Sequence, residues 1–176
     1  ELELLVCELE ETLTAVLNQI LHQQSWQKLE AAWRGIYWLC HTAQTSDDLR
    51  IDCATVTKEL LWEDLFNSAD LLDSNLYQHV YVDSIGQYGA VPYGALLIDD
   101  YFAGSGSDLR LLKALTNVCG KAHLPIVTAA SASMFNIEDF NALQDVSSLS
   151  DIHGSSVFIK WRNFIASQEA SYLALT

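Results

Sequence analysis

The pattern of apolar and polar positions begins with two helical stretches. In the first, apolar residues recur every three or four positions as far as about His22, which predicts an amphipathic helix. The second runs from Ser25, the expected N-cap, to about Ala43. Large aromatic side chains bury much area, so we expect this helix to be a core element. Its buried side should be the one that carries Trp26, Trp33 and Cys40.

Single residues give further information on the second helix and on the elements after it. A glycine at Gly35 costs about 1 kcal/mol inside a helix and suggests that another element crosses closely there. Residues 49–54 alternate apolar and polar side chains, which predicts a half-buried strand. Either Thr55 or Thr57 can cap the helix after it, and either Asp70 or Ser74 can open the next helical stretch.

The centre of the chain predicts a parallel pair of strands. The unbroken apolar run from Tyr93 to Ile98 is typical of a strand covered on both faces. A Gly/Ser loop, an amphipathic segment from Asp108 to Lys121 with Ser107 as its cap, and a second apolar run from Leu124 to Ala129 follow it. Strand, loop, helix, strand is the βαβ order. The expected fold class is therefore α/β, a mixed sheet with a parallel βαβ core flanked by helices and a helix-rich N-terminal part.

The last third predicts short elements. Residues 131–135, 137–143 and 146–152 are expected to form short helical turns, and Ser155 or Ser156 to cap a final helix that ends near Ala166. A strand is expected to begin at Tyr172. With 176 residues and no low-complexity linker, residues 1–176 are expected to form a single domain.

Charge and composition narrow the classes of function. Acidic residues outnumber basic ones by 23 to 9, for a net charge of −14, which argues against nucleic-acid partners and anionic membrane surfaces. No apolar run reaches the ~20 residues that span a bilayer, and the opening residues lack the basic region of a signal peptide. The four cysteines are scattered without a C-x-x-C pair, as in a reducing compartment. We expect a cytoplasmic protein without a membrane partner.

One candidate site for chemistry uses two adjacent acids. Asp99 and Asp100 are expected at the carboxyl end of the central strand and Thr128 at the end of the next. Ligands bind at that edge of open α/β sheets, so a Mg²⁺-dependent enzyme or a receiver-like domain is the alternative hypothesis. No companion lysine or third acid can be placed from the sequence. The favoured interpretation is structural, with no catalytic residue, cofactor or metal.

Other patterns give no stronger chemistry. The Gly104–Ser107 loop matches neither phosphate-binding glycine motif, and Asp108 would repel a phosphate there. The five histidines lack the spacing of metal ligands, and no G-x-S-x-G nucleophile elbow is present. Nothing in these patterns requires an enzyme.

Four blocks of residues together resemble the large contractile-sheath subunit of the bacterial type VI secretion system (the TssC/VipB/ImpC family). The blocks lie at residues 25–39, 92–101, 122–135 and 160–176. Within them the family-motif residues, expected to be structural, are Trp26, Leu29, Trp33, Arg34, Gly35, Pro92, Tyr93, Gly94, Asp100, Tyr101, His123, Pro125, Trp161, Phe164 and Tyr172. Ile165 and Ser171 depart from the pattern, where the family has basic residues.

The resemblance implies a structural role and several partners. It implies that the chain is an amino-proximal part of a longer subunit that pairs with a small sheath subunit and polymerises with other large subunits around an inner tube protein. Contraction of such a sheath drives the tube outward, and a cytoplasmic ring ATPase then disassembles it, through regions that this sequence does not contain. By the same resemblance, the chain has no catalytic activity.

Overall fold

The computed structural model describes residues 2–43, 49–85, 87–135, 137–141 and 158–176. It divides the chain into two compact units, Glu1–Ala54 and Thr55–Thr176, and each is described by itself. The expectation of a single domain stays a prediction.

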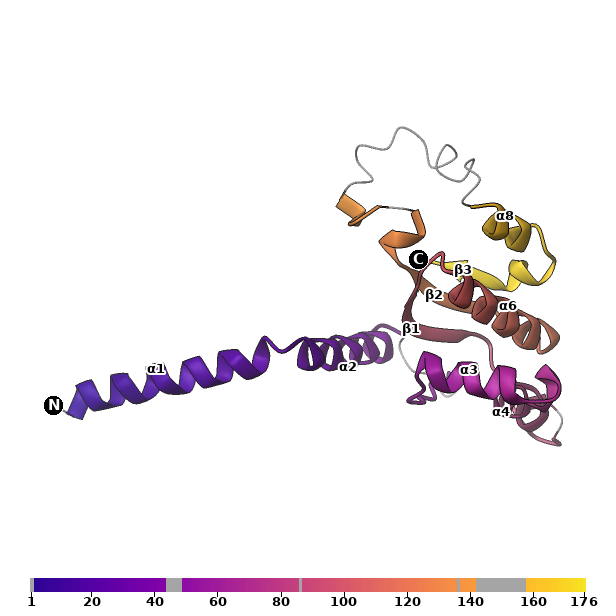
Figure 1. The fold of residues 1–176 in the computed structure, drawn as a ribbon. Coiled ribbons are helices and arrows are strands. Elements are labelled where there is room, and N and C mark those ends of the chain that lie inside the picture. The colour runs from indigo at the N-terminus through magenta and orange to yellow at the C-terminus, as the bar shows by residue number, and fades with distance from the viewer. Residues whose placement is uncertain (1, 44–48, 86, 136, 142–157) are drawn as a thin grey trace. The chain divides into compact units, whose positions relative to one another are not determined.

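The described residues of the first unit include two helices, α1 (Leu2–Leu21) and α2 (Gln24–Thr42) (Figure 1). α1 contains no glycine or proline, and its apolar stripe confirms the predicted amphipathic helix. The predicted cap of α2 is wrong. Gln23 takes the extended N-cap conformation, and Ser25 lies in the first turn. Neither helix has a buried residue.

The expected strand at residues 49–54 is also wrong, because residues 49–57 form no regular element. Alternation gives a segment two different faces, but a strand exists only where another strand accepts its backbone hydrogen bonds. No described strand pairs with this segment. Within it, Arg50 and Asp52 form an exposed ion pair, with 2.9 Å between Arg50 Nε and Asp52 Oδ1.

The second unit begins with short helices, and their N-caps can be predicted from the sequence. Thr57 accepts a hydrogen bond from the Leu60 N–H at 3.3 Å, Asp70 one from the Leu72 N–H, and Ser74 one from the Tyr77 N–H. These three predicted caps are confirmed. The elements are α3 (Lys58–Asn67), the 3₁₀ turn η1 (Leu71–Asp73), α4 (Asn75–Tyr77), the π-helical η2 (Gln78–Val82) and α5 (Asp83–Ile85).

The rest of the second unit contains the predicted βαβ core. Its elements are β1 (Leu96–Phe102), α6 (Gly106–Lys121), β2 (Ile126–Ala130), the turn η3 (Ala132–Phe135), α8 (Ile159–Ile165), the turn η6 (Glu169–Tyr172) and β3 (Leu173–Leu175). The described strands form one parallel sheet in the order β1-β2-β3 (Figure 1). The α/β class, the parallel pair and the final strand are therefore confirmed. The expected helix at 146–152 and the caps Ser155 and Ser156 lie outside the described residues.

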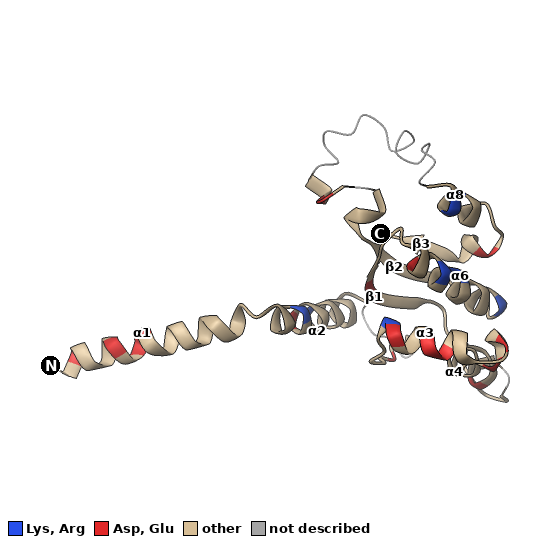
Figure 2. Cartoon of the chain, in the orientation of Figure 1, with Lys and Arg blue, Asp and Glu red and all other residues tan. Residues whose placement is uncertain are grey.

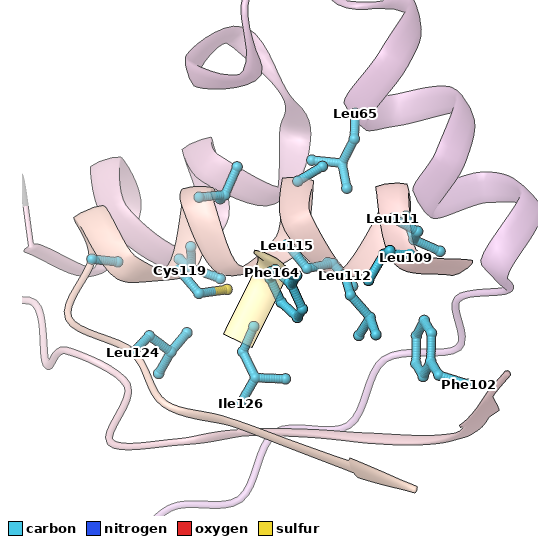
Figure 3. Packing of buried hydrophobic residues seen from close by; sticks show 14 residues of the cluster. Leu65, Phe102, Leu109, Leu111, Leu112, Leu115, Cys119, Leu124, Ile126 and Phe164 are labelled. Carbon is cyan, nitrogen blue, oxygen red and sulfur yellow. The ribbon is translucent and has the colours of Figure 1, made fainter. Parts of the chain in front are cut away.

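The core of this unit is centred on α6. Eight of its sixteen residues are buried, as expected for a helix that is apolar on more than one side. Figure 3 shows Leu65 of α3 on one side of α6, and Phe102 of β1 and Ile126 of β2 on the other. Full burial of one such aliphatic side chain contributes about 1.5–3 kcal/mol, so this helix supplies much of the unit's stability. The cap of α6 is Ser105, which accepts from the Asp108 N–H, and not Ser107 as predicted.

β1 departs from its prediction in two ways. It begins at Leu96 and not at Tyr93, and its side chains alternate between half-buried and exposed. Leu97 and Tyr101 are 56% and 64% exposed. The expectation of a strand covered on both faces is therefore wrong. β1 lies at an edge of the sheet, and its neighbours in the described unit pack against one face only.

Candidate functional site

The first candidate is the exposed apolar face of α2. Trp26 and Trp33 are 43% and 64% exposed, and Leu29 is exposed as well. The expectation that this side would be buried in the core is wrong for the described residues, because a hydrophobic stripe records a preference for burial and not which molecule provides the covering surface. A Cβ built on Gly35 meets no atom within 4 Å, so the predicted close crossing is absent from the described residues. Arg34 pairs with Glu30 at 2.7 Å.

α1 presents a second exposed apolar face. Its stripe combines residues three and four apart, and every one is at least 45% exposed: Leu2, Leu5, Leu9, Leu13, Val16, Leu17, Ile20 and Leu21. Large contiguous apolar surfaces mark interaction sites in folded proteins. The first unit therefore carries two helical faces suited to a helical partner.

The two adjacent acids lie inside β1 and not at its carboxyl end as predicted. The pairing with β2 shifts between Ile98 and Tyr101, so Asp99 and Asp100 occupy a bulge. The Thr128 hydroxyl, 2% exposed, lies 3.1 Å from the Ile98 carbonyl oxygen and 3.0 Å from that of Asp100. Because its proton is donated to these carbonyls, Thr128 holds the bulge and does not face a ligand site.

Lys58 is the lysine that sequence reasoning did not place beside Asp100. Its Nζ lies 3.6 Å from Asp100 Oδ1 and 3.8 Å from Asp108 Oδ2. It also donates to the Tyr101 carbonyl oxygen and lies 4.4 Å from the centroid of the Phe102 ring. Lys58 opens α3, so the only available signal was a basic residue after the Thr57 cap.

Asp108, the second acid near Lys58, also stabilises the fold. Asp108 Oδ2 accepts a hydrogen bond from the Ala103 N–H at 2.7 Å, which ties the start of α6 to the end of β1. Within the described residues, no group of three or more His, Cys, Asp or Glu side chains gathers as metal ligands would. The arrangement around Lys58 joins α3, β1 and α6, and its observed contacts are those of an ionic junction.

Two further motif blocks form tyrosine–histidine pairs. The Tyr93 hydroxyl lies 3.1 Å from His79 Nε2, which connects the loop before β1 to η2. His123 has a positive φ of 52°, and its Nδ1 lies 2.9 Å from the Tyr172 hydroxyl. The Tyr172 ring also limits Gly120, where an added Cβ would lie 3.3 Å from Cδ2. These contacts fix the turn from α6 into β2 against the segment that leads into β3.

The remaining motif residues lie at the boundary of the core. Phe164 is buried and its ring centroid is 5.5 Å from that of Trp161, which packs against the core. The Pro125 carbonyl accepts from the Leu96 N–H at 2.9 Å, whereas Pro92 and Gly94 are exposed. The fifteen motif residues are thus distributed over several contacts and do not converge on one pocket.

No helix among the described residues has the length and apolar character needed to cross a lipid bilayer.

Comparison with known proteins gives two matches. The family model described as VipB: EvpB/VC_A0108, tail sheath N-terminal domain, matches residues 3–176. The chain is also 30% identical over 177 residues to the type VI secretion system sheath protein TssC1 of Pseudomonas aeruginosa, a match that covers 99% of this chain and 36% of that protein. The chain therefore spans about a third of the length of this relative.

Proposed function

Because the chain belongs to the VipB family of type VI secretion tail sheath proteins, we propose that it is part of a large sheath subunit that pairs with the small sheath subunit. The family is one of structural sheath proteins and not a known enzyme family. The observation that carries the proposal is the exposed apolar stripe of α1 and α2, on helices without a single buried residue. A helix of the small subunit is the partner that fits it.

The wider proposal covers the assembled sheath. The paired subunits polymerise with other large subunits around the inner tube protein in the cytoplasm, and contraction of the polymer powers effector delivery. The sheath-disassembling ATPase acts on the contracted polymer, through regions of the sheath other than this chain. The chain itself has no catalytic role, and the family-motif residues serve packing and assembly. The junction of Lys58 with Asp100 and Asp108 supports this, because its groups are engaged in joining three elements.

Co-purification with the small sheath subunit of the same organism tests the pairing. Leu9→Glu together with Val16→Glu places two charges in the apolar stripe of α1 and should abolish co-purification. The matched control, Asn18→Glu with Gln19→Glu, adds the same two charges on the polar side of the helix and should leave it intact. Equal binding by both variants would show that the stripe is not the contact. Failure of the unaltered chain to bind would refute the pairing itself.

A further inference from the structure

A groove in the second unit brings together three basic side chains of an otherwise acidic chain. It has a volume of about 620 Å³ and lies where α3, α6 and α8 meet. Trp62 of α3 and Leu109 of α6 supply apolar surface, and Arg110, Lys113 and Lys160 line the same groove. Three of the chain's nine lysines and arginines are therefore gathered here, in a protein of net charge −14.

These three cations form no ion pair with a carboxylate of the described residues. The Arg110 guanidinium lies 5.3 Å from the Trp62 ring centroid and 5.2 Å from that of Phe66, within range of cation–π attraction to both rings. All three side chains, Arg110, Lys113 and Lys160, are exposed. The groove thus offers three cations beside an apolar floor, and its positive charge fits an acidic protein segment.

Such a segment is present in the first unit. α1 carries Glu3, Glu8, Glu10 and Glu11 but no lysine or arginine, and none of these acids is in an ion pair with a described residue. Figure 2 shows this contrast between acidic positions on α1 and basic positions on α6 and α8. Glu8 and Glu11 are three residues apart and share one side of α1, as Arg110 and Lys113 share one side of α6.

We propose that the groove binds the side of α1 that carries Glu8 and Glu11, here called its acidic side, from a second copy of this chain. The proposal rests on the proposed assembly function and names one contact between large subunits. At 100° per residue, Glu8 and Glu11 lie roughly opposite the apolar stripe of α1. The stripe therefore remains available to the small subunit while the acidic side lies in a neighbour's groove. This geometry lets one helix join two partners.

Sedimentation velocity of the whole chain over a concentration series tests the proposal. Lys113→Glu with Lys160→Glu should weaken self-association about tenfold, since it replaces attraction by repulsion at exposed pairs. The matched control, Lys28→Glu with Lys121→Glu, makes the same change in net charge outside the groove and should have little effect. Adding Glu8→Lys and Glu11→Lys to the first variant should restore association. Added salt should weaken the wild-type contact.

Several outcomes would overturn the proposal. The wild-type chain could remain monomeric. The groove variant and its control could lose self-association equally. Exchanging Glu8 and Glu11 for lysine could fail to restore self-association in the groove variant. A further one is binding of inorganic phosphate or ATP to the groove without association of copies, which would identify a small-anion site. Co-purification with the small subunit is a separate measurement. Failure of the unaltered chain to co-purify would refute the pairing, whereas failure of the unaltered chain to self-associate would refute only the contact between large subunits.

Discussion

The core role of α6 can be tested with two leucine-to-alanine changes in the same unit. Leu115 is fully buried on α6, at 0% exposure, whereas Leu97 on β1 is 56% exposed. Both changes remove the same atoms, so they differ chiefly in environment. Leu115→Ala removes buried apolar surface and leaves a cavity between α6 and its neighbours, and such changes cost about 2–5 kcal/mol. Leu97→Ala exposes little new surface and should cost less than about 1 kcal/mol.

Urea denaturation measures this difference. Trp62 and Trp161 report on the second unit if Trp26, Trp33 and Trp38 of α2 are first replaced by phenylalanine. With a slope of about 1–3 kcal/mol per molar urea, a loss near 3 kcal/mol lowers the midpoint by about 1–3 M. The slope should be the same for both variants. A midpoint shift for Leu115→Ala no larger than that for Leu97→Ala would refute the packing around α6.

Three further predictions concern single positions. Thr128→Val keeps the shape but leaves the bulge carbonyls without their donor, so it should lower the free energy of unfolding by about 1–3 kcal/mol; Thr128→Ser should recover most of this in the same urea assay. Gly120→Val should destabilise the chain by about 1–3 kcal/mol by displacing Tyr172, and a Tyr172→Ala background should remove most of that loss; an unchanged penalty there would exclude the contact. Burial raises the pKa of Cys119 from 9.0 to about 12, so its stabilisation is present below pH 9.0 and lost as the pH rises toward 12. At pH 8 an alkylating reagent should modify exposed Cys53 and spare Cys119, and rapid modification of Cys119 in folded protein would contradict its burial.

The elements that the sequence determined are those controlled by local chemistry. Thr57, Asp70 and Ser74 each cap a helical turn because a side-chain oxygen needs only a backbone N–H two or three residues away. The order of strand, helix and strand from Leu96 to Ala130 follows from apolar runs and periodicity within the same short stretch. The motif blocks, taken together, also identified the family from the sequence alone, because each block keeps several bulky residues in a fixed order.

Tertiary structure decided what depends on distant partners. The aromatic stripe around Trp33 predicted burial, but neither α1 nor α2, the two helices described in the first unit, has a buried residue. The position of Asp100 within β1 depends on a shift in pairing with β2, which no local pattern encodes. Lys58 reaches Asp100 because α3 begins beside β1, and the groove of Arg110, Lys113 and Lys160 exists because α6 and α8 lie together. Periodicity specifies which side of an element is apolar, but the surface that covers that side, or the charge that meets it, comes from residues far along the chain or from another molecule.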